Sequence, residues 1–265
     1  MAPVIGVFDS GFGGLTVLRE LRKSLPLADF LYFGDTAHLP YGAKSVRTVA
    51  KYATSAAHFL EARGIEILVV ACNTATALAF DEIRSAVKVP VVGVIEPGAE
   101  RALAISRTKK AAVLATEATV ASHAYQLALQ RLGLQATEKA CPLFVPLVEE
   151  GWVEHPVTEE VAHIYIDEIF SAHGSAREAD VLVLGCTHYP LLRPLLRRVA
   201  PARVEIVDSA ESTAAKVVEM LGKNSQGKQG GLRCYTTDSV EKFRVLGGRF
   251  LGSPITHIEL IDIEN

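Results

Sequence analysis

The chain alternates short apolar runs with segments whose apolar residues recur every three to four positions. The short runs are rich in β-branched and aromatic residues, a pattern typical of buried strands, and the longer segments have helical periodicity. We predict strands at 4–8, 30–33, 67–71, 91–95, 111–115, 181–184 and 204–207. Helices are predicted at 15–25, 45–63, 76–87, 120–132, 191–199 and 212–221. This alternation predicts an α/β fold with mostly parallel sheets.

A coarse internal similarity predicts two lobes. The runs 4–9 and 111–116 each end a strand on a polar residue ahead of a helix. We expect two similar α/β lobes with mostly parallel sheets, and an active site in the cleft between them. The first lobe is predicted to comprise 1–95 and 209–265, and the second 96–208. A polar, glycine-rich segment at 222–231 is predicted to be a surface loop.

Composition narrows the function classes. The 265 residues include 27 Lys and Arg against 30 Asp and Glu, for a formal charge of −3, and no dense basic run is present. Nucleic acid and anionic membrane are therefore not expected as partners. The sequence has no signal-peptide pattern and no apolar stretch near the roughly 18 residues of a membrane helix, so we expect a cytoplasmic protein.

Two cysteines occupy matching positions. Cys72 and Cys186 each close an apolar run and precede a polar stretch, Asn-Thr-Ala-Thr and Thr-His-Tyr-Pro respectively. Strand carboxyl ends and helix N-terminal N–H groups converge at such corners, which are common ligand sites in α/β proteins. The helix N-terminus after Cys72 is expected to favour a thiolate, giving a nucleophile or a base. For Cys141 and Cys234 we favour the role of small buried apolar residues.

Two further loops offer ligand contacts. Asp9 and Ser10 open the glycine-rich turn Asp-Ser-Gly-Phe-Gly-Gly, but Thr16 stands where a dinucleotide fingerprint requires its third glycine. In the loop 34–42, Tyr41 and Gly42 are the better candidates for ligand contact.

Rival chemistries fit the spacing poorly. Cys72, Cys186 and His188 are badly spaced for a zinc site, and no metal is expected. A phosphatase loop would need an arginine nearer to either cysteine, and disulfide redox chemistry would need a second, closely spaced cysteine.

Five motifs together resemble the cofactor-independent glutamate racemases of bacterial peptidoglycan synthesis. They lie at 8–20, 34–42, 71–76, 145–149 and 184–192, and the resemblance spans nearly the whole chain. It implies that Cys72 and Cys186 are the two catalytic acid/base groups. Asp9 would assist Cys72, and His188 with Glu149 would assist Cys186.

The resemblance also implies a substrate-binding set, in which Glu117-Ala118 departs from the Pro-Gly often seen between two of the positions. The set comprises Asp9, Ser10, Tyr41, Gly42, Asn73, Thr74, Thr116, Thr119, Thr187 and His188. The implied reaction is the interconversion of L- and D-glutamate for peptidoglycan, without cofactor or metal, by a homodimer. Two alternatives stay open, namely a related aspartate racemase and a non-catalytic binding protein.

Overall fold

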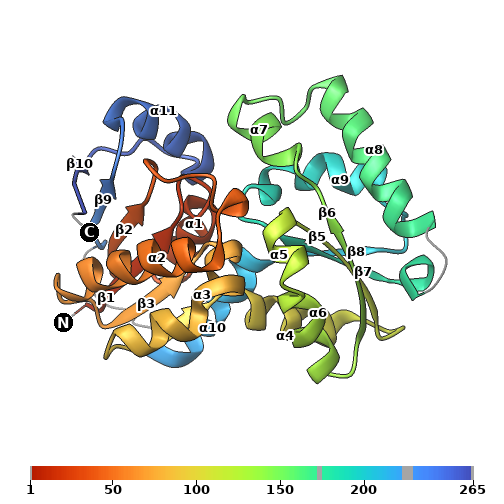
Figure 1. Cartoon of the computed structure of the whole chain (residues 1–265), viewed down its shortest axis with the longest axis horizontal. Coiled ribbons are helices and arrows are strands. Elements are labelled where there is room, and N and C mark those ends of the chain that lie inside the picture. Colours follow the sequence, from red (N-terminus) through yellow and green to blue (C-terminus); the bar gives the residue numbers. More distant parts are fainter. Residues whose placement is uncertain (1, 172–174, 223–228, 264–265) are drawn as a thin grey trace. The chain divides into compact units, whose positions relative to one another are not determined.

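The chain forms two compact units, each built around a parallel sheet (Figure 1). A computed structural model describes residues 2–171, 175–222 and 229–263. The first unit comprises Met1–Val94 and Ala210–Asn265, and the second comprises Ile95–Ser209. Every strand pairing in the described residues is parallel, which confirms the predicted α/β class.

The first unit has a six-stranded sheet in the order β10-β9-β2-β1-β3-β4. Its strands are β1 (Val4–Asp9), β2 (Asp29–Gly34), β3 (Ile67–Val70), β4 (Val91–Gly93), β9 (Leu232–Thr236) and β10 (Ile258–Leu260). Its helices are α1 (Leu15–Ser24), the 3₁₀ turn η1 (Tyr41–Ala43), α2 (Val46–Glu61), α3 (Asn73–Ala86), α10 (Ser209–Leu221) and α11 (Val240–Leu251). The last two strands and α11 come from the end of the chain, so β9 lies beside β2 although about two hundred residues separate them.

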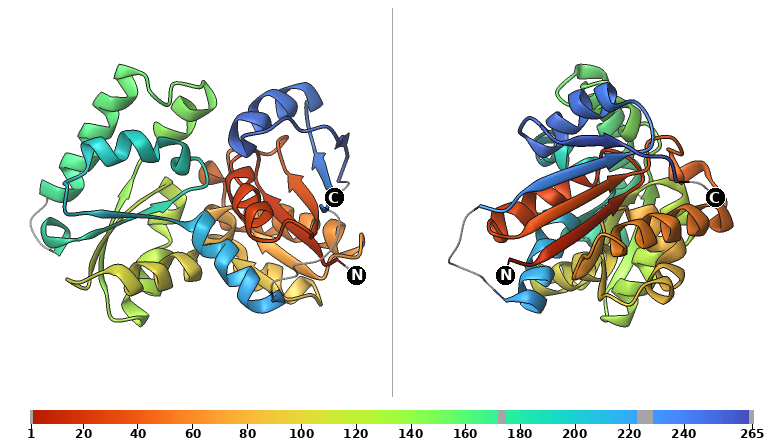
Figure 2. Two further views of the ribbon diagram at one scale, coloured as in Figure 1. Left: turned by 180° about the vertical axis from the view of Figure 1, so that it is seen from behind. Right: turned by 90° about the vertical axis from the view of Figure 1, so that its left-hand side faces the viewer.

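Helices cover both faces of this sheet (Figure 2). Successive strand side chains point to opposite faces. Phe33 packs edge-on against Phe59 of α2 at 5.1 Å between ring centroids, whereas its neighbour Tyr32 packs against Phe243 of α11 at 5.9 Å. Burial on both faces explains why the strands are almost continuously apolar.

The second unit has a four-stranded sheet in the order β6-β5-β7-β8. Its strands are β5 (Lys110–Ala115), β6 (Gln135–Ala140), β7 (Val181–Gly185) and β8 (Glu205–Asp208). Its helices are α4 (Ile95–Ile105), α5 (Glu117–Ala121), α6 (Ala124–Arg131), α7 (Phe144–Glu149), α8 (Pro156–Ser171), η2 (Ser175–Glu178), η3 (Tyr189–Leu192) and α9 (Arg193–Val199). In Figure 1, α4 and α6 lie below this sheet, and α8 and α9 lie above it.

Two predicted elements differ from the structure in their bounds. The strand predicted at 91–95 ends at Gly93, and Ile95 begins α4, because a short apolar run does not by itself distinguish a strand from a buried helix start. The helix predicted at 120–132 is interrupted at His123, whose φ of 55° is left-handed, so that α5 and α6 are separate helices. Residues 223–228 of the predicted glycine-rich loop lie outside the described residues. Within the described ranges, no helix is long and apolar enough to cross a membrane.

Candidate active site

In the first unit, the predicted site residues lie where β1 and β3 end. Phe8 pairs with Val70, so that Asp9 and Cys72 follow on neighbouring strands. Asp9 is 1% exposed, and its Oδ2 accepts a hydrogen bond from the Gly11 N–H at 2.9 Å. This turn requires a glycine at position 14, because an added Cβ would lie 2.5 Å from the Cβ of Asp9.

Cys72 is the N-cap residue of α3 and is buried. Its Sγ accepts a hydrogen bond from the Ala75 N–H at 3.4 Å and donates one to Ser10 Oγ at 3.4 Å. Burial and the nearby Asp9 carboxylate raise the pKa of Cys72 from 9.0 to about 12, although these hydrogen bonds oppose the shift. The helix N-terminus lowers the pKa of Cys72 through the Ala75 N–H, as expected, but burial and the Asp9 charge outweigh it, so that the net shift is upward.

The first turn of α3 carries the other polar residues of this corner. Asn73 and Thr74 are 2% and 4% exposed. The Thr76 hydroxyl donates to the carbonyl oxygens of Val70 and Cys72 at 3.1 and 2.9 Å, and so fixes the path of the chain between β3 and α3.

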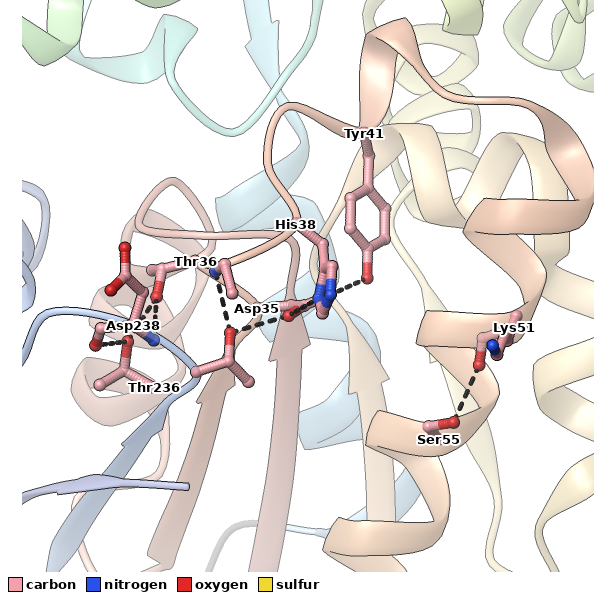
Figure 3. Close-up of polar contacts among 10 residues, drawn as sticks. Asp35, Thr36, His38, Tyr41, Lys51, Ser55, Thr236 and Asp238 are labelled. Carbon is pink, nitrogen blue, oxygen red and sulfur yellow. Dashed lines mark hydrogen bonds and ion pairs between the residues drawn. The ribbon is translucent and has the colours of Figure 1, made fainter. Parts of the chain in front are cut away.

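The loop after β2 brings Tyr41 into the same apolar cluster as Cys72. Tyr41 is 1% exposed, and its hydroxyl donates to Asp35 Oδ2 at 2.7 Å (Figure 3). Gly42 follows within η1. Sequence reasoning did not single out Asp35, whose partners only the fold reveals.

In the second unit, Cys186 begins a chain of three side chains after β7. Its Sγ lies 3.9 Å from Nδ1 of His188, and Nε2 of His188 lies 3.1 Å from Oε1 of Glu149 at the end of α7. Burial lowers the pKa of His188, but the contacts with Cys186 and Glu149 outweigh it and raise this pKa from 6.5 to about 10. These two contacts therefore favour the charged form of the imidazole. Thr187, which lies between Cys186 and His188 in the sequence, is 5% exposed.

Thr116 and Thr119 lie at the neighbouring strand end. Ala115 pairs with Gly185, so that Thr116 and Cys186 each follow one strand of a hydrogen-bonded pair. Thr116 caps α5, its Oγ1 accepting from the Thr119 N–H at 3.4 Å. Glu117 and Ala118, which stand where the family often has Pro-Gly, thus begin a regular short helix.

The two units repeat one arrangement. In each, a buried cysteine lies just after a strand, and the neighbouring strand either ends on a polar residue, Asp9, or is followed directly by one, Thr116. All four cysteines carry free thiols. In the ranges that the structure describes, no cluster of three or more His, Cys, Asp or Glu side chains could hold a metal ion.

Comparisons with known proteins agree along nearly the whole length of the chain. Residues 15–217 match the family described as Asp/Glu/Hydantoin racemase. A protein named glutamate racemase from Koribacter versatilis strain Ellin345 is 55% identical, with 98% of each chain covered. The solved glutamate racemase RacE1 of Bacillus anthracis superposes with a TM-score of 0.90 at 34% identity, covering 98% of this chain and 97% of the other.

A second solved structure carries a bound amino acid. The glutamate racemase of Francisella tularensis subsp. tularensis SCHU S4, in complex with D-glutamate, has a TM-score of 0.89 at 34% identity, covering 99% and 98% of the two chains. Fold and sequence together define an enzyme of the amino-acid racemase class. The chain belongs to the Asp/Glu/Hydantoin racemase family.

Proposed function

We propose that this enzyme interconverts L- and D-glutamate by a two-base mechanism, with Cys72 and Cys186 as the bases. One observation carries the proposal. In each unit, a buried cysteine lies just after a central strand of the sheet. The substrate is inferred from the relatives, which are named glutamate racemases at up to 55% identity.

Inversion at Cα requires a proton to leave one face and another to arrive at the opposite face. A thiolate on one side takes the α-proton, so that the C–H bond breaks and an S–H bond forms. A thiol on the other side gives its proton to the carbanion, so that this sulfur becomes the thiolate. No electron is gained or lost. Each turnover reverses the protonation of the two sulfurs, and the opposite direction of reaction starts from the reversed state.

The surroundings of the two sulfurs differ. The raised pKa of Cys72, about 12, keeps this residue a thiol near neutral pH. The imidazolium of His188 stands beside the sulfur of Cys186 and is itself held by Glu149. A positive charge next to a sulfur stabilises its thiolate form. We therefore propose that the unliganded enzyme holds Cys72 as the thiol, and that His188 and Glu149 assist Cys186 in its acid/base role.

Charge that develops on the substrate carboxylate needs hydrogen-bond donors. The α-proton is a very weak acid, and removing it spreads negative charge onto the carboxylate, which donors already in place stabilise. Asn73 and Thr74 sit on the first turn of a 14-residue helix, where N–H groups and the helix dipole favour an anion. Ser10, Thr187 and the backbone N–H of Gly42 complete the proposed set, and Thr116 and Thr119 are assigned to the substrate side as well.

The proposed cellular role follows from the product. D-glutamate would be supplied to peptidoglycan synthesis in the cytoplasm, by an enzyme that we predict to be a homodimer. Rescue of a bacterial strain that requires D-glutamate for growth tests the role. Size-exclusion chromatography with light scattering tests the oligomeric state, and a monomeric mass would contradict the dimer.

Single cysteine replacements test the chemistry. We expect Cys72→Ala and Cys186→Ala each to lower the rate of glutamate racemisation, followed by circular dichroism, by at least about 10³-fold, since each removes an acid/base group. Cys234→Ala and Cys141→Ala are matched controls, because both thiols are buried and outside the proposed site. Full activity in either Cys72→Ala or Cys186→Ala would refute the mechanism. Faster inversion of L-aspartate than of L-glutamate by the wild type would overturn the proposed substrate.

A further inference from the structure

A buried carboxylate organises the loop that carries Tyr41 and Gly42. Asp35 directly follows β2 and is 2% exposed. Its Oδ2 accepts from the Tyr41 hydroxyl at 2.7 Å, and its Oδ1 lies 2.8 Å from Nδ1 of His38 (Figure 3). A carboxylate is costly to bury unless hydrogen bonds satisfy both oxygens. Asp35 therefore fixes Tyr41 and His38 relative to the end of β2.

The same loop is tied to a segment about two hundred residues away, the connection between β9 and α11. The Thr237 hydroxyl donates to Asp35 Oδ1 at 2.8 Å, and it accepts from the Ala37 N–H at 2.9 Å. The hydroxyls of Thr36 and Thr236 lie 2.7 Å apart. The C-terminal connection therefore holds both the side chain of Asp35 and the backbone that follows it.

A third support comes from α2 and from the core beneath the loop. The His38 ring stacks on Tyr52 of α2 at 3.8 Å between centroids and an interplanar angle of 18°. The Tyr41 ring packs against Phe8 of β1, with centroids 6.3 Å apart. Burial, the Asp35 carboxylate and then Cys72 raise the pKa of Tyr41 well above its usual value, so the phenol stays a neutral donor. The Tyr41 hydroxyl therefore donates its hydrogen bond to Asp35 within the protein.

We propose that Asp35 and Thr237 are positioning residues that hold the Tyr41–Gly42 turn in its substrate-binding conformation, with the C-terminal connection as the outer support. The inference rests on the proposed function, because it assigns the turn to glutamate binding. It also changes what Tyr41 contributes: its side chain anchors the turn to Asp35, and the backbone of the turn contacts the substrate. Binding groups that are already fixed in the free protein lose less conformational entropy when the ligand binds.

Removal of the Thr237 hydroxyl tests this with little change of shape. Thr237→Val deletes two hydrogen bonds, each worth about fivefold in an equilibrium. We expect KM for glutamate to rise about tenfold while kcat stays within about twofold, because binding is lost equally from the ground and transition states. Thr237→Ser restores the hydroxyl and should return KM to within about twofold of the wild type.

Ser55→Ala is the matched control. Its hydroxyl donates to the carbonyl oxygen of Lys51 within α2, in the same unit but apart from the loop (Figure 3). This variant also loses one hydroxyl, and its KM should equal that of the wild type. A rise in KM as large in Ser55→Ala as in Thr237→Val would show a general loss of stability and would overturn the positioning role.

Hydrogen exchange supplies a readout independent of turnover. Amides of the peptide 36–44 should exchange faster in Thr237→Val than in the wild type, and no faster in Ser55→Ala. Asp35→Asn, which keeps the shape and removes the charge, should act in the same direction on KM and on exchange. Should Thr237→Val not fold, Thr36→Val removes the hydroxyl that Thr236 and the Asp238 N–H share, the latter at 3.0 Å.

The two proposals fail in different ways. A wild type that does not racemise glutamate contradicts the proposed function. An active wild type whose Thr237→Val variant keeps both its KM and its loop protection contradicts the positioning role alone.

Discussion

The contact between Glu149 and His188 gives the most quantitative test of how the second unit prepares its thiol. Nε2 and Oε1 lie 3.1 Å apart, and both side chains are largely buried, at 11% and 22% exposure. The pKa of His188 is about 10 against an ordinary 6.5. Relative to a free imidazole, the protein therefore stabilises the charged form by about 5 kcal/mol, since a change of one in pKa is 1.36 kcal/mol. Cys186 and Glu149 share this effect.

Glu149→Gln removes the negative charge and keeps the size of the side chain. If Glu149 supplies about half of the stabilisation, the variant loses about 2–3 kcal/mol of preference for the imidazolium. The pKa of His188 falls, and the imidazole becomes neutral at a lower pH. The alkaline limb of kcat/KM, in the direction of reaction that uses Cys186 as the base, should move toward neutrality by about 1–2 pH units.

Kinetics from pH 6 to 10.5, with each enantiomer as substrate, measure that limb. Nuclear magnetic resonance of ¹⁵N-labelled histidine follows the imidazole directly. Glu150→Gln is the matched control, because this exposed residue follows Glu149 at the end of α7 and the substitution changes the same atoms. An unmoved alkaline limb in Glu149→Gln, or a wild-type His188 that titrates near 6.5, would refute the reasoning.

Three further outcomes are expected. Because the folded-state pKa of His188 is raised, the stability that this residue contributes is complete below pH 6.5 and is lost as pH rises through about 10. Urea unfolding across this pH range should show the decline, and a flat profile would contradict it. Iodoacetamide at pH 7.5 should alkylate Cys72 slowly, because its pKa is about 12, and rapid alkylation of Cys72 in peptide mass spectra would contradict its proposed thiol state. Gly14→Ala places a Cβ 2.5 Å from a neighbouring Cβ and should destabilise by about 1–3 kcal/mol, whereas Gly248→Ala, with its nearest atom at 3.7 Å, should be neutral or stabilising in the same assay.

Local patterns predicted what depends on neighbours in sequence. The corner after β3 is visible because an apolar run ends at Cys72 and hydroxyl-bearing residues follow, and the structure places Cys72 at the N-cap of α3. The end of the strand predicted at 91–95 was misplaced because its apolar residues carry no stop signal between β4 and α4. The left-handed His123 gave no warning either, since glycine is the residue that usually marks such a break.

Contacts distant in sequence were out of reach of those patterns. Asp35 reads as one polar residue in a loop, and only the pairing of β2 with β9 brings Thr237 to its carboxylate. Similarly, His188 and Glu149 are 39 residues apart, and their pairing was implied by the resemblance and by no spacing rule. The net rise of the Cys72 pKa could not be predicted, because the helix N-terminus is visible in the sequence, whereas burial and the approach of Asp9 come from the tertiary fold.

Deuterium incorporation at low conversion tests the two-base chemistry most directly. L-glutamate is incubated with the wild type in deuterated water, and both enantiomers are separated and analysed by mass spectrometry before one tenth has reacted. With two bases, the D-glutamate formed carries deuterium at Cα, because its proton comes from the second, solvent-exchanged thiol, while the remaining L-glutamate keeps its hydrogen. D-glutamate that retains the original hydrogen, or L-glutamate that exchanges as fast as the product appears, would show a single base and contradict the mechanism.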